Sequence, residues 1–555
     1  MPGTDAIVVG AGHNGLVTAA YLARAGLRTL VLERRDRVGG ACVTEELWPG
    51  YRVSRAAYVA GLLRPAVVAE LGLPGRGLHL LRRDPSSFTP LPDGRGLLLG
   101  SDPALCRREI ARFSARDAEA YPRYEALLDR AARAFEPLLD APPPDPARLR
   151  AADLPLLARL ARGAFGLRRD AARVARLLLA PARDTLTAWF ESEPLRATLA
   201  TDALIGAWAA PSTPGTGYVL FHHVMGETGG ARGVWAYVQG GMGALSEAIA
   251  GAARAAGAEI LTGAPVASID VHDGRVRGVT LADGRSFEAP LVVSGADPAH
   301  TLLGLVGAKA LPAEITRELA TLDFRSPVVK INLALDRLPV FRGGPPAAQG
   351  PGPEHAGTIH VGTHDLDALE RSFAQAAGGR LAERPMIELT LPSALDPSLA
   401  PAGRHVASLF VQHVPPALAR ERWARERDGF ADRVLALVDE VAPGFSASVL
   451  HRDVLGPPEL EEVFGLTGGN LFHGAMTLDR LLFLRPLPGW ARYRTPIAGL
   501  WLCGAGTHPG GGVMGACGRN AAREILRSRR TRGGGLPQFA AGTRSAAASA
   551  TSVPS

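Results

Sequence analysis

The sequence predicts an α/β protein in which one open sheet is assembled from the two ends and the middle of the chain. Three observations carry this prediction. The first forty residues follow the order strand, glycine-rich turn, helix and strand, which is the order of a βαβ unit. A second α/β stretch begins near Gly240, and a strand at Leu500 ends in a glycine-dense loop that precedes a helix.

The length and composition of the chain are those of a soluble, folded protein. At 555 residues it is longer than one hydrophobic core requires, so we expect two domains that share long connections. The apolar fraction of 46% and the charged fraction of 21% argue against a disordered, fibrous or disulfide-rich class. The net charge is +7, but the basic residues are spread along the chain rather than clustered with aromatic residues, which argues against nucleic acid as a partner.

The cysteines and the apolar runs bear on the cellular compartment. Cys42, Cys106, Cys503 and Cys517 are too few and too scattered for a disulfide framework and lack metal-ligand spacing, so we expect a reducing compartment and no metal. The N-terminus lacks the basic region and long apolar stretch of a signal peptide. No eighteen apolar residues run together, so no helix is expected to span a bilayer. We expect a cytoplasmic protein, with peripheral membrane attachment left open.

The turn Gly10-Ala11-Gly12-His13-Asn14-Gly15 has the spacing and the context of a dinucleotide-binding turn. It lies between an expected strand at Ala6–Val9 and an expected helix at Leu16–Ala25, and a second strand at Thr29–Leu32 follows. The first glycine permits the tight turn, the second lets backbone amides approach a pyrophosphate, and the third lets the helix pack close to the strand. Glu33 is placed to accept hydrogen bonds from the ribose hydroxyls and would repel a 2′-phosphate. A glycine-rich turn without a ligand is the alternative.

Arg37-Val38-Gly39-Gly40, shortly after Glu33, favours FAD over NAD. Here the chain resembles the flavoprotein superfamily that carries a paired glycine after the second strand. Gly39 and Gly40 leave the backbone free to pass close to the cofactor, where any Cβ would collide. We also expect Arg34, next to Glu33, to bind the cofactor. A bare structural turn is the alternative.

The middle of the chain completes the expected organisation. From Gly240 the sequence predicts a helix at Ala244–Ala255, a strand near Ile260, strands at Val266–Val271 and Val276–Leu281, and an apolar run at Leu291–Val293. Residues 102–209 alternate apolar and arginine positions at helical spacing, which predicts an inserted helical subdomain. Residues 312–490 contain strand-like runs at Pro327–Leu335 and Met386–Leu391, which we expect to form the floor of a substrate domain.

These segments define the expected domains. Residues 1–75, 232–305 and 491–530 form a discontinuous, Rossmann-like FAD-binding domain; residues 76–231 are the helical insert of the substrate domain; and residues 306–490 are the mixed α+β substrate domain. Residues 531–555 are rich in Gly, Ala, Ser and Thr without periodicity and are expected to be a disordered tail.

The segment at 500–515, LWLCGAGTHPGGGVMG, carries the most specific resemblance. It resembles the C-terminal flavin signature of the bacterial phytoene desaturase and carotenoid isomerase family. With GGNLFHG at 468–474 and SPVVKINLALD at 326–336, the chain is still more similar to the relatives named pyridine nucleotide-disulfide oxidoreductase domain-containing protein 2. VVSGADP at 292–298 and GGMGAL at 240–245 also match, so the resemblance covers nearly the whole chain before the tail.

The resemblance implies a fold of the flavin amine oxidase and phytoene desaturase type, with noncovalent FAD. It also implies that Val266 gives backbone hydrogen bonds to the adenine, and that Gly504, Val513 and Met514 line the ribityl and isoalloxazine portion. The residues add a physical reason, because six glycines within twelve residues after a strand are an entropic cost that close approach to a ligand explains.

Three absences narrow the chemistry. Disulfide reductases carry a second cysteine five residues after the first; here Cys42 is followed by Leu47, which excludes a redox-active disulfide. The glycine cluster at 241–243 has Ser246 in place of a third glycine, so no separate nicotinamide domain is expected. No nucleophile elbow, HExxH or P-loop is present, which leaves hydrolysis and phosphoryl transfer without the residues that they need.

Two residues are candidates for chemistry beside the flavin. Lys330 lies in the strand expected at 328–335, where related amine oxidases carry a lysine that holds a water beside the flavin, and it is one of two lysines in the chain. An ammonium there would stabilise reduced flavin or assist its reoxidation. A lysine packed at a domain edge is the alternative. His473, in GGNLFHG, is the second candidate, and its alternative is a structural histidine.

Together these features indicate an FAD-dependent oxidoreductase of the dehydrogenase or desaturase type. The expected substrate is small and hydrophobic, with isoprenoids among the candidates, and the expected electron acceptor is oxygen or a quinone. The alternatives are a flavin amine oxidase, a redox-neutral carotenoid-type isomerase and a non-catalytic binding protein on the same scaffold. The arginine-studded stretch at 156–179 suits either a helix on anionic lipid or an ordinary outer helix. The oligomeric state stays open.

Overall fold

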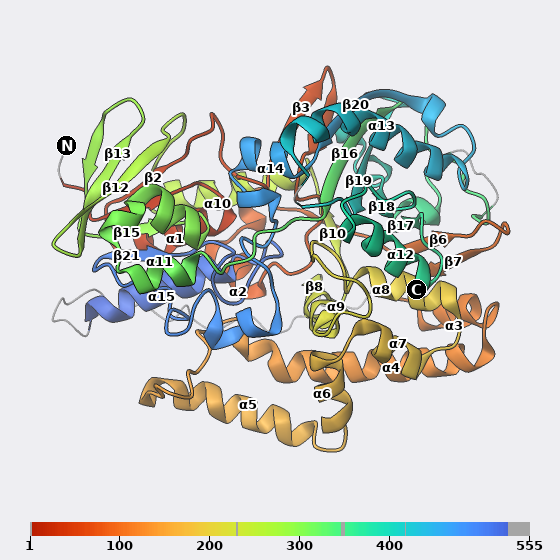
Figure 1. Cartoon of the computed structure of the whole chain (residues 1–555), viewed down its shortest axis with the longest axis horizontal. Coiled ribbons are helices and arrows are strands. Elements are labelled where there is room, and N and C mark those ends of the chain that lie inside the picture. Colours follow the sequence, from red (N-terminus) through yellow and green to blue (C-terminus); the bar gives the residue numbers. More distant parts are fainter. Residues whose placement is uncertain (1–2, 229–230, 346–349, 417, 531–555) are drawn as a thin grey trace, which may run out of the picture.

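The computed structural model describes residues 3–228, 231–345, 350–416 and 418–530. In Figure 1 a five-stranded parallel sheet lies on the left, a seven-stranded sheet lies on the right, and helices line the lower edge. The tail expected at 531–555 lies outside the described residues.

The five-stranded sheet draws its strands from both ends and the middle of the chain. Its strand order is β11-β2-β1-β15-β21, and all four pairings are parallel. The strands are β1 (Ala6–Val9), β2 (Thr29–Leu32), β11 (Glu259–Leu261), β15 (Val292–Ser294) and β21 (Leu500–Leu502). Each lies within a residue or two of the run that the sequence predicts.

Alternation along these strands builds a hydrophobic core on each face of the sheet, because successive side chains of a strand point to opposite sides. Val8 and Val31 pack against α1 (His13–Arg24), α10 (Met242–Ala255) and α15 (Ala516–Arg530). Ile7 and Leu30 belong to a second core with the antiparallel sheet of β12 (Val266–His272), β13 (Arg275–Leu281) and β14 (Ser286–Glu288).

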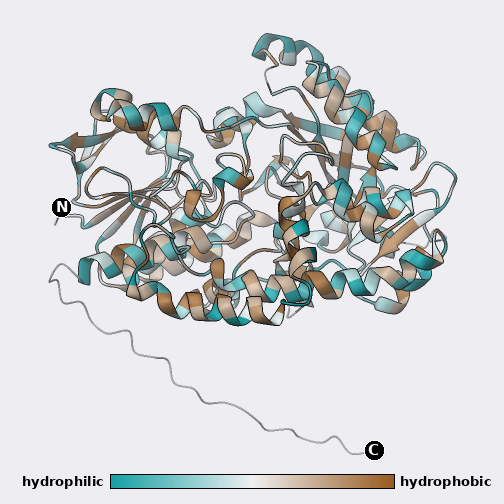
Figure 2. Cartoon of the chain, turned by 60° about the horizontal axis from the view of Figure 1, so that its bottom comes forward, coloured by the Kyte–Doolittle hydropathy of each residue, from teal (hydrophilic) through white to brown (hydrophobic). Residues whose placement is uncertain are grey.

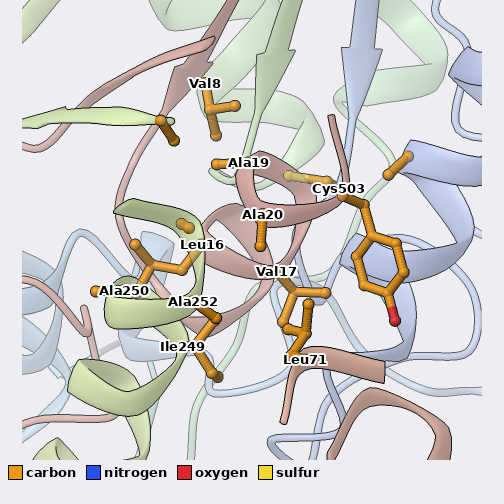
Figure 3. Close-up of a cluster of buried hydrophobic side chains, with 14 of the residues drawn as sticks. Val8, Leu16, Val17, Ala19, Ala20, Leu71, Ile249, Ala250, Ala252 and Cys503 are labelled. Atoms are coloured by element: carbon orange, nitrogen blue, oxygen red, sulfur yellow. The ribbon is translucent and has the colours of Figure 1, made fainter. Parts of the chain in front are cut away.

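Small residues let the helices on the first face approach one another. Figure 3 shows Ala19 and Ala20 of α1 in the same cluster of buried side chains as Val8 of β1 and Ile249 of α10. At the contact with α15, a Cβ on Gly518 would lie only 2.2 Å from the carbonyl oxygen of Asn14. The hydroxyl of Thr18 donates a hydrogen bond of 3.2 Å to the carbonyl oxygen of Gly518. Helix α1 is therefore fixed at the carboxyl ends of the parallel strands, where ligands of such sheets bind.

The second sheet has the order β20-β16-β19-β18-β17-β6-β7. Its strands are β6 (Ser87–Pro90), β7 (Gly96–Leu99), β16 (Val328–Leu335), β17 (Thr358–Val361), β18 (Met386–Thr390), β19 (His405–Gln412) and β20 (Val449–Leu455). Ile331 and Leu333 of β16 pack with Trp423 and Phe430 of α13 (Arg420–Asp439). Lys330 alternates with them and therefore points to the opposite face of the sheet.

The segment expected to be a helical insert, residues 76–231, is helical only in part. Strands β6 and β7 come from it and belong to the seven-stranded sheet, because β6 pairs in parallel with β17. The helices of this segment are α3 (Pro103–Ala111), α4 (Ala115–Phe135), α5 (Leu154–Gly166), α6 (Ala171–Leu179), α7 (Ala182–Trp189), α8 (Glu193–Thr201) and α9 (Thr216–Val224). All of these helices except α5 contribute side chains to a core that includes Tyr124 and Phe190.

Shorter elements complete the molecule. The helices are α2 (Pro65–Leu71), α11 (Ala313–Leu319), α12 (Leu366–Ala377) and α14 (Pro457–Phe464); the strands are β3 (Thr44–Trp48), β4 (Tyr51–Ser54), β5 (Leu80–Arg82), β8 (Glu227–Thr228), β9 (Ala231–Arg232) and β10 (Ala236–Val238). Among the residues that the structure describes, no helix combines the length and the apolar character needed to cross a membrane.

Candidate active site

The glycine-rich turn after β1 forms an open cradle at the start of α1. Gly10 has a φ of +90°, which favours glycine, and a Cβ on Gly15 would lie 2.1 Å from the carbonyl oxygen of Gly10. At Gly12, in contrast, no protein atom lies within 4 Å of the position that a Cβ would take. The free amides at the N-terminus of α1 border this space, and such amides favour an anion.

Glu33 closes one side of the cradle and is almost fully buried. Its Oε2 accepts a hydrogen bond of 2.8 Å from the amide of Ala11, and its Oε1 accepts one of 3.0 Å from the amide of Arg35. Each carboxylate oxygen keeps a lone pair for a ligand hydroxyl. The neighbouring Arg34 donates 2.8 Å to the carbonyl of Glu462 and also lines the cavity described below.

The paired glycines pass directly beside this turn. The amide of Gly39 donates 2.8 Å to the carbonyl oxygen of Ala11, and a Cβ on Gly39 would lie 2.4 Å from the carbonyl oxygen of Cys42. A Cβ on Gly40 would lie 3.4 Å from the Cα of Gly12. Both paired glycines have positive φ, so the backbone follows a path that other residues rarely adopt.

The loop after β21 approaches the same space from the other end of the chain. A Cβ on Gly504 would lie 2.3 Å from the carbonyl oxygen of Gly295, and Val513 has a φ of +56°. Gly504 and Val513 line the cavity together with Val266 at the start of β12. Met514 is buried in the helical core instead, and its carbonyl oxygen accepts a hydrogen bond from the amide of Arg64.

One cavity of about 790 Å³ joins the glycine cradle to the seven-stranded sheet. The expected cofactor-binding residues that line it are Gly10, Gly12, Gly15, Glu33, Arg34, Gly39, Gly40, Val266, Gly504 and Val513. The cavity then continues past apolar side chains such as Leu220 and Phe410. These residues fit a dinucleotide, because glycines leave room for close backbone approach, helix amides face the open space and a carboxylate stands at the end of β2.

The far part of the cavity contains a polar cluster that no sequence motif indicates: Tyr58, Arg83, Asp202, His360 and Glu388. The hydroxyl of Tyr58 donates 3.1 Å to Oε2 of Glu388, and Nδ1 of His360 lies 3.9 Å from Oε1 of Glu388. The guanidinium of Arg83 lies 5.0 Å from the centre of the Tyr237 ring, a cation–π distance.

Burial shifts the titration of this cluster. Burial, and next the neighbouring Asp202, raise the pKa of Glu388 to about 7. Burial also raises the pKa of Asp202 to about 6, against the opposing charge of Arg83. Burial and Arg83 lower the pKa of His360 to about 3, so this imidazole is neutral near pH 7. Two carboxyl groups therefore titrate close to neutrality inside one cavity, a pattern common at functional sites.

Lys330 lies behind this cluster and is not among the residues that line the cavity. Its Nζ donates a hydrogen bond to the hydroxyl of Ser408 and lies 3.9 Å from the centre of the Tyr58 ring, and Tyr58 does line the cavity. Burial lowers the pKa of Lys330 to about 7, against the opposing influence of Glu388. The pleat of β16 directs the ammonium toward the Tyr58 ring, so Lys330 contacts a residue that lines the cavity without lining the cavity itself.

His473 lines the cavity close to the glycine cradle. It has a φ of +55°, and its Nδ1 is buried with no hydrogen-bond partner among the residues that the structure describes. Burial lowers the pKa of His473, and nearby Asp297 opposes the shift. Burial, and next His473, lower the pKa of His13 to about 4, which places two imidazoles near the start of α1.

Arg485 is a structural residue of the site that the sequence did not single out. Its fully buried guanidinium donates 2.8 Å to the carbonyl of Phe472 and 2.9 Å to the carbonyl of Ala505. It thereby ties the loop of His473 to the loop after β21. Burial lowers the pKa of Arg485 to about 10. The residues around Arg485 have no recurring spacing, so the sequence held no signal for this role.

None of the four cysteines is paired with another in the structure. Cys42, Cys106, Cys503 and Cys517 are each buried and free. Burial raises the pKa of Cys42 to about 12, which keeps its sulfur as a thiol at neutral pH.

The chain is similar to known proteins over nearly its whole length. The family described as "Flavin containing amine oxidoreductase" matches residues 15–526. Pyridine nucleotide-disulfide oxidoreductase domain-containing protein 2 of Mus musculus is 50% identical over 546 residues, which cover 95% of this chain and 94% of that protein. One of the subunits of limonene dehydrogenase from Castellaniella defragrans is 29% identical, over 94% of each chain.

Two more comparisons concern the expected resemblance and the fold. A lycopene-forming phytoene desaturase of Pseudescherichia vulneris is 28% identical, over 92% of this chain and 96% of that protein. Among solved structures, cyclohexylamine oxidase of Brevibacterium oxydans superimposes with a TM-score of 0.57 at 21% identity, over 95% of this chain and all of that chain. The resemblance expected from the sequence motifs is confirmed, and so is the expected fold class.

Proposed function

Because the chain belongs to the flavin-containing amine oxidoreductase family and is an FAD-dependent oxidoreductase, we propose that it dehydrogenates an organic substrate bound between the glycine cradle and the seven-stranded sheet. One observation carries this proposal. A single cavity joins the residues that fit a dinucleotide to a chamber lined by side chains of the substrate domain. A substrate bound in this cavity would therefore contact a cofactor bound at the cradle.

We propose specific roles for the residues of the cradle. The backbone at Gly12 and the first amides of α1 hold the pyrophosphate, and Glu33 accepts hydrogen bonds from the ribose hydroxyls. Gly504 and Val513 border the flavin portion. When bound, FAD accepts a hydride equivalent from the substrate. The chain's own contribution is to bind, orient and shield the two molecules.

The apolar walls of the chamber favour a substrate with a hydrophobic body. Leu128, Leu199, Ile205 and Leu220 line it. Two relatives are named for limonene dehydrogenation and phytoene desaturation, and these names favour an isoprenoid substrate for this chain too. We therefore keep a desaturase-like dehydrogenase as the first candidate function.

Amine oxidation is the second candidate, and the polar cluster favours it. Asp202 and Glu388 are carboxyl groups inside the cavity whose pKa values burial raises to about 6 and about 7. A cationic ammonium bound between them would stabilise both carboxylates and offset their burial. A pure hydrocarbon offers no such compensation. The two candidates therefore differ in their dependence on Glu388.

We propose that Lys330 is a positioning residue that acts through Tyr58, since its ammonium lies over that ring. His473 is proposed to face the cofactor near its pyrophosphate, because it lines the cavity beside His13. The proposed electron acceptor is oxygen or a quinone. The proposed compartment is the cytoplasm, whose reducing conditions suit four free thiols.

The test begins with the absorbance spectrum of the purified protein, which we expect to show bound flavin. Candidate amines and isoprenoid hydrocarbons are then added without oxygen, and bleaching of the flavin bands identifies the substrate class. Oxygen or a quinone is admitted next, and the agent that restores the bands is the acceptor. Conversion only by pre-reduced protein, with no net redox change, would indicate an isomerase. A colourless protein that takes up no added FAD would refute the proposal.

A matched pair of variants separates the two candidate substrates. Glu388→Gln keeps the size of the side chain and its hydrogen bond with Tyr58 but removes the charge. We expect it to weaken amine-dependent bleaching at least tenfold and to leave bleaching by a hydrocarbon nearly unchanged. Glu440→Gln, at an exposed ion pair with Arg384, is the control and should alter neither.

A further inference from the structure

The segment from Arg148 to Leu179 forms an arm that contains α5 and α6, here called the arginine arm. It carries eight arginines and two aspartates, a formal charge of +6 in a chain whose total is +7. In Figure 1 both helices lie at the lower edge, on the outside of the helical layer, and Figure 2 brings this edge toward the viewer. The arm therefore accounts for most of the net positive charge of the chain, although basic residues occur throughout it.

Helix α5 carries apolar residues on two faces. Leu156, Gly163 and the following Leu167 face the body, and a Cβ on Gly163 would lie 2.9 Å from the Cβ of Ala134 in α4. Leu154 and Phe165 are eleven residues apart, which is three helical turns, so they share the opposite face. Their exposed fractions are 62% and 68%. Between them on this outer face lie two more exposed residues, Ala158 and Ala161.

Exposed large hydrophobic residues are concentrated on this arm. The structure describes seven of them, and four belong to the arm: Leu149, Leu154, Phe165 and Leu179. Single exposed apolar side chains are ordinary on a protein surface. A group of them on one projecting element, bordered by positive charge, is instead typical of a surface that contacts another phase or molecule.

The arginines of α5 are free to meet an outside anion. Both aspartates of the arm are already paired, Asp153 with Arg492 and Asp170 with Arg130 at 2.8 Å. No ion pair is found for Arg159 or Arg162 within the described part of the chain, and both are exposed. The arm therefore presents uncompensated positive charge next to the apolar face of α5.

We propose that the arginine arm docks on the surface of an anionic lipid bilayer, with α5 in the plane of the interface. Leu154 and Phe165 enter the boundary of the acyl chains, while Arg159 and Arg162 contact the anionic head groups. A second copy of the chain is a poor occupant, because two arms of like charge repel one another. A bilayer supplies both of the required chemistries, an apolar interior and a negative surface.

The position of the arm gives this docking a consequence for access to the cavity. Asp129 and Arg133 of α4 line the cavity, and the side chain of Arg133 is 69% exposed, so the cavity reaches the surface at α4. Helix α5 packs on the adjoining face of the same helix, at Ala134. Docking thus brings the opening to the bilayer surface. This consequence rests on the proposed function, whereas the docking itself does not.

Vesicle co-sedimentation of the purified, full-length, flavin-containing protein tests the proposal. Vesicles of phosphatidylcholine alone are compared with vesicles that contain phosphatidylcholine and phosphatidylglycerol in a 1:1 ratio. We expect the protein to pellet with the anionic vesicles and not with the neutral ones, and to be released by high salt. Leu154→Glu with Phe165→Glu should abolish pelleting, and Arg159→Glu with Arg162→Glu should weaken it at least roughly fivefold for each arginine.

Controls distinguish docking from misfolding. Val340→Glu with Leu450→Glu places the same two charges on exposed apolar residues outside the arm and should pellet like the unmodified protein. An unchanged flavin spectrum in every variant shows that the fold is intact. Equal pelleting with neutral and anionic vesicles, or unchanged pelleting of the Leu154 and Phe165 variant, overturns the proposal. So does a concentration-dependent dimer that the same variant abolishes without any binding to vesicles.

Discussion

Gly12 and Gly15 belong to the same turn but should respond differently to an added methyl group. A methyl group on Gly12 meets no protein atom within 4 Å, and the φ of −64° at this residue suits alanine. A methyl group on Gly15 would lie 2.1 Å from the carbonyl oxygen of Gly10. Gly12→Ala therefore interferes only with a ligand in the cradle, whereas Gly15→Ala forces β1 and α1 apart.

The magnitudes follow from these contacts. For the cofactor-free protein, Gly12→Ala should cost at most about 1 kcal/mol, through the change at the N-cap of α1. Gly15→Ala should cost about 1–3 kcal/mol, as overpacking of a close contact does. Saturation with FAD at one hundred times its Kd stabilises the unmodified protein by about 2.7 kcal/mol. Gly12→Ala should lose at least tenfold in FAD affinity, which is about 1.4 kcal/mol of that stabilisation.

The assay is unfolding of the cofactor-free protein with and without added FAD, together with a fluorescence titration of FAD. Gly251→Ala, in α10 with no atom within 4 Å of a Cβ, is the matched control. It should gain up to about 1 kcal/mol in stability and bind FAD normally. Unchanged FAD affinity in Gly12→Ala would refute the placement of the pyrophosphate at this turn.

Three further predictions concern the rest of the site. The folded protein binds more protons at Glu388 than the unfolded chain does between pH 4.5 and about 7, so this residue costs stability as pH rises through that window. Glu388→Gln should therefore be more stable than the unmodified protein at pH 8, by up to about 3 kcal/mol, and equally stable at pH 4; denaturant unfolding at both pH values checks the difference. Arg485→Met should cost on the order of 3 kcal/mol by leaving buried carbonyl oxygens without a donor, and FAD titration should show weakened binding, whereas Arg285→Met at an exposed ion pair should change neither. Thiol titration in denaturant without reductant should give four free thiols, and Cys42→Ala should keep its activity; fewer thiols, or an inactive variant with a normal flavin spectrum, would contradict the absence of disulfide chemistry.

The residues of the glycine cradle were predictable because they lie close together in the sequence with a recognisable spacing. Gly10, Gly12 and Gly15 lie within six residues, and the strand and helix beside them follow from short apolar runs. The paired glycines and the loop after β21 also carry their own spacing. Met514 shows the limit of such reasoning, because a loop motif does not say which of its side chains packs into a neighbouring core.

The substrate chamber was not predictable in the same way. Arg83, Asp202 and Glu388 come from three distant segments, and no spacing links them. Their proximity depends on how the end of β5, strand β18 and the end of α8 pack in three dimensions. Lys330 illustrates an intermediate case, since its strand was predicted but the ring between its ammonium and the cavity was not. The segment expected to be a helical insert also contains β6, and local patterns do not reveal its pairing with β17 because that pairing is a long-range contact.

The order of the strands in the five-stranded sheet affects how the protein folds while it is being synthesised on the ribosome. Its last strand, β21, and the helix α15 that packs on α1 are made some five hundred residues after β1, and Thr18 bonds across that whole interval to Gly518. At about 5–20 residues per second, translation separates the two by roughly 25–100 s. Until β21 is made, β15 has no partner on that side, and the glycine-dense loop that follows β21 is absent from the site. We therefore expect the FAD-binding cradle to be completed only near the end of synthesis.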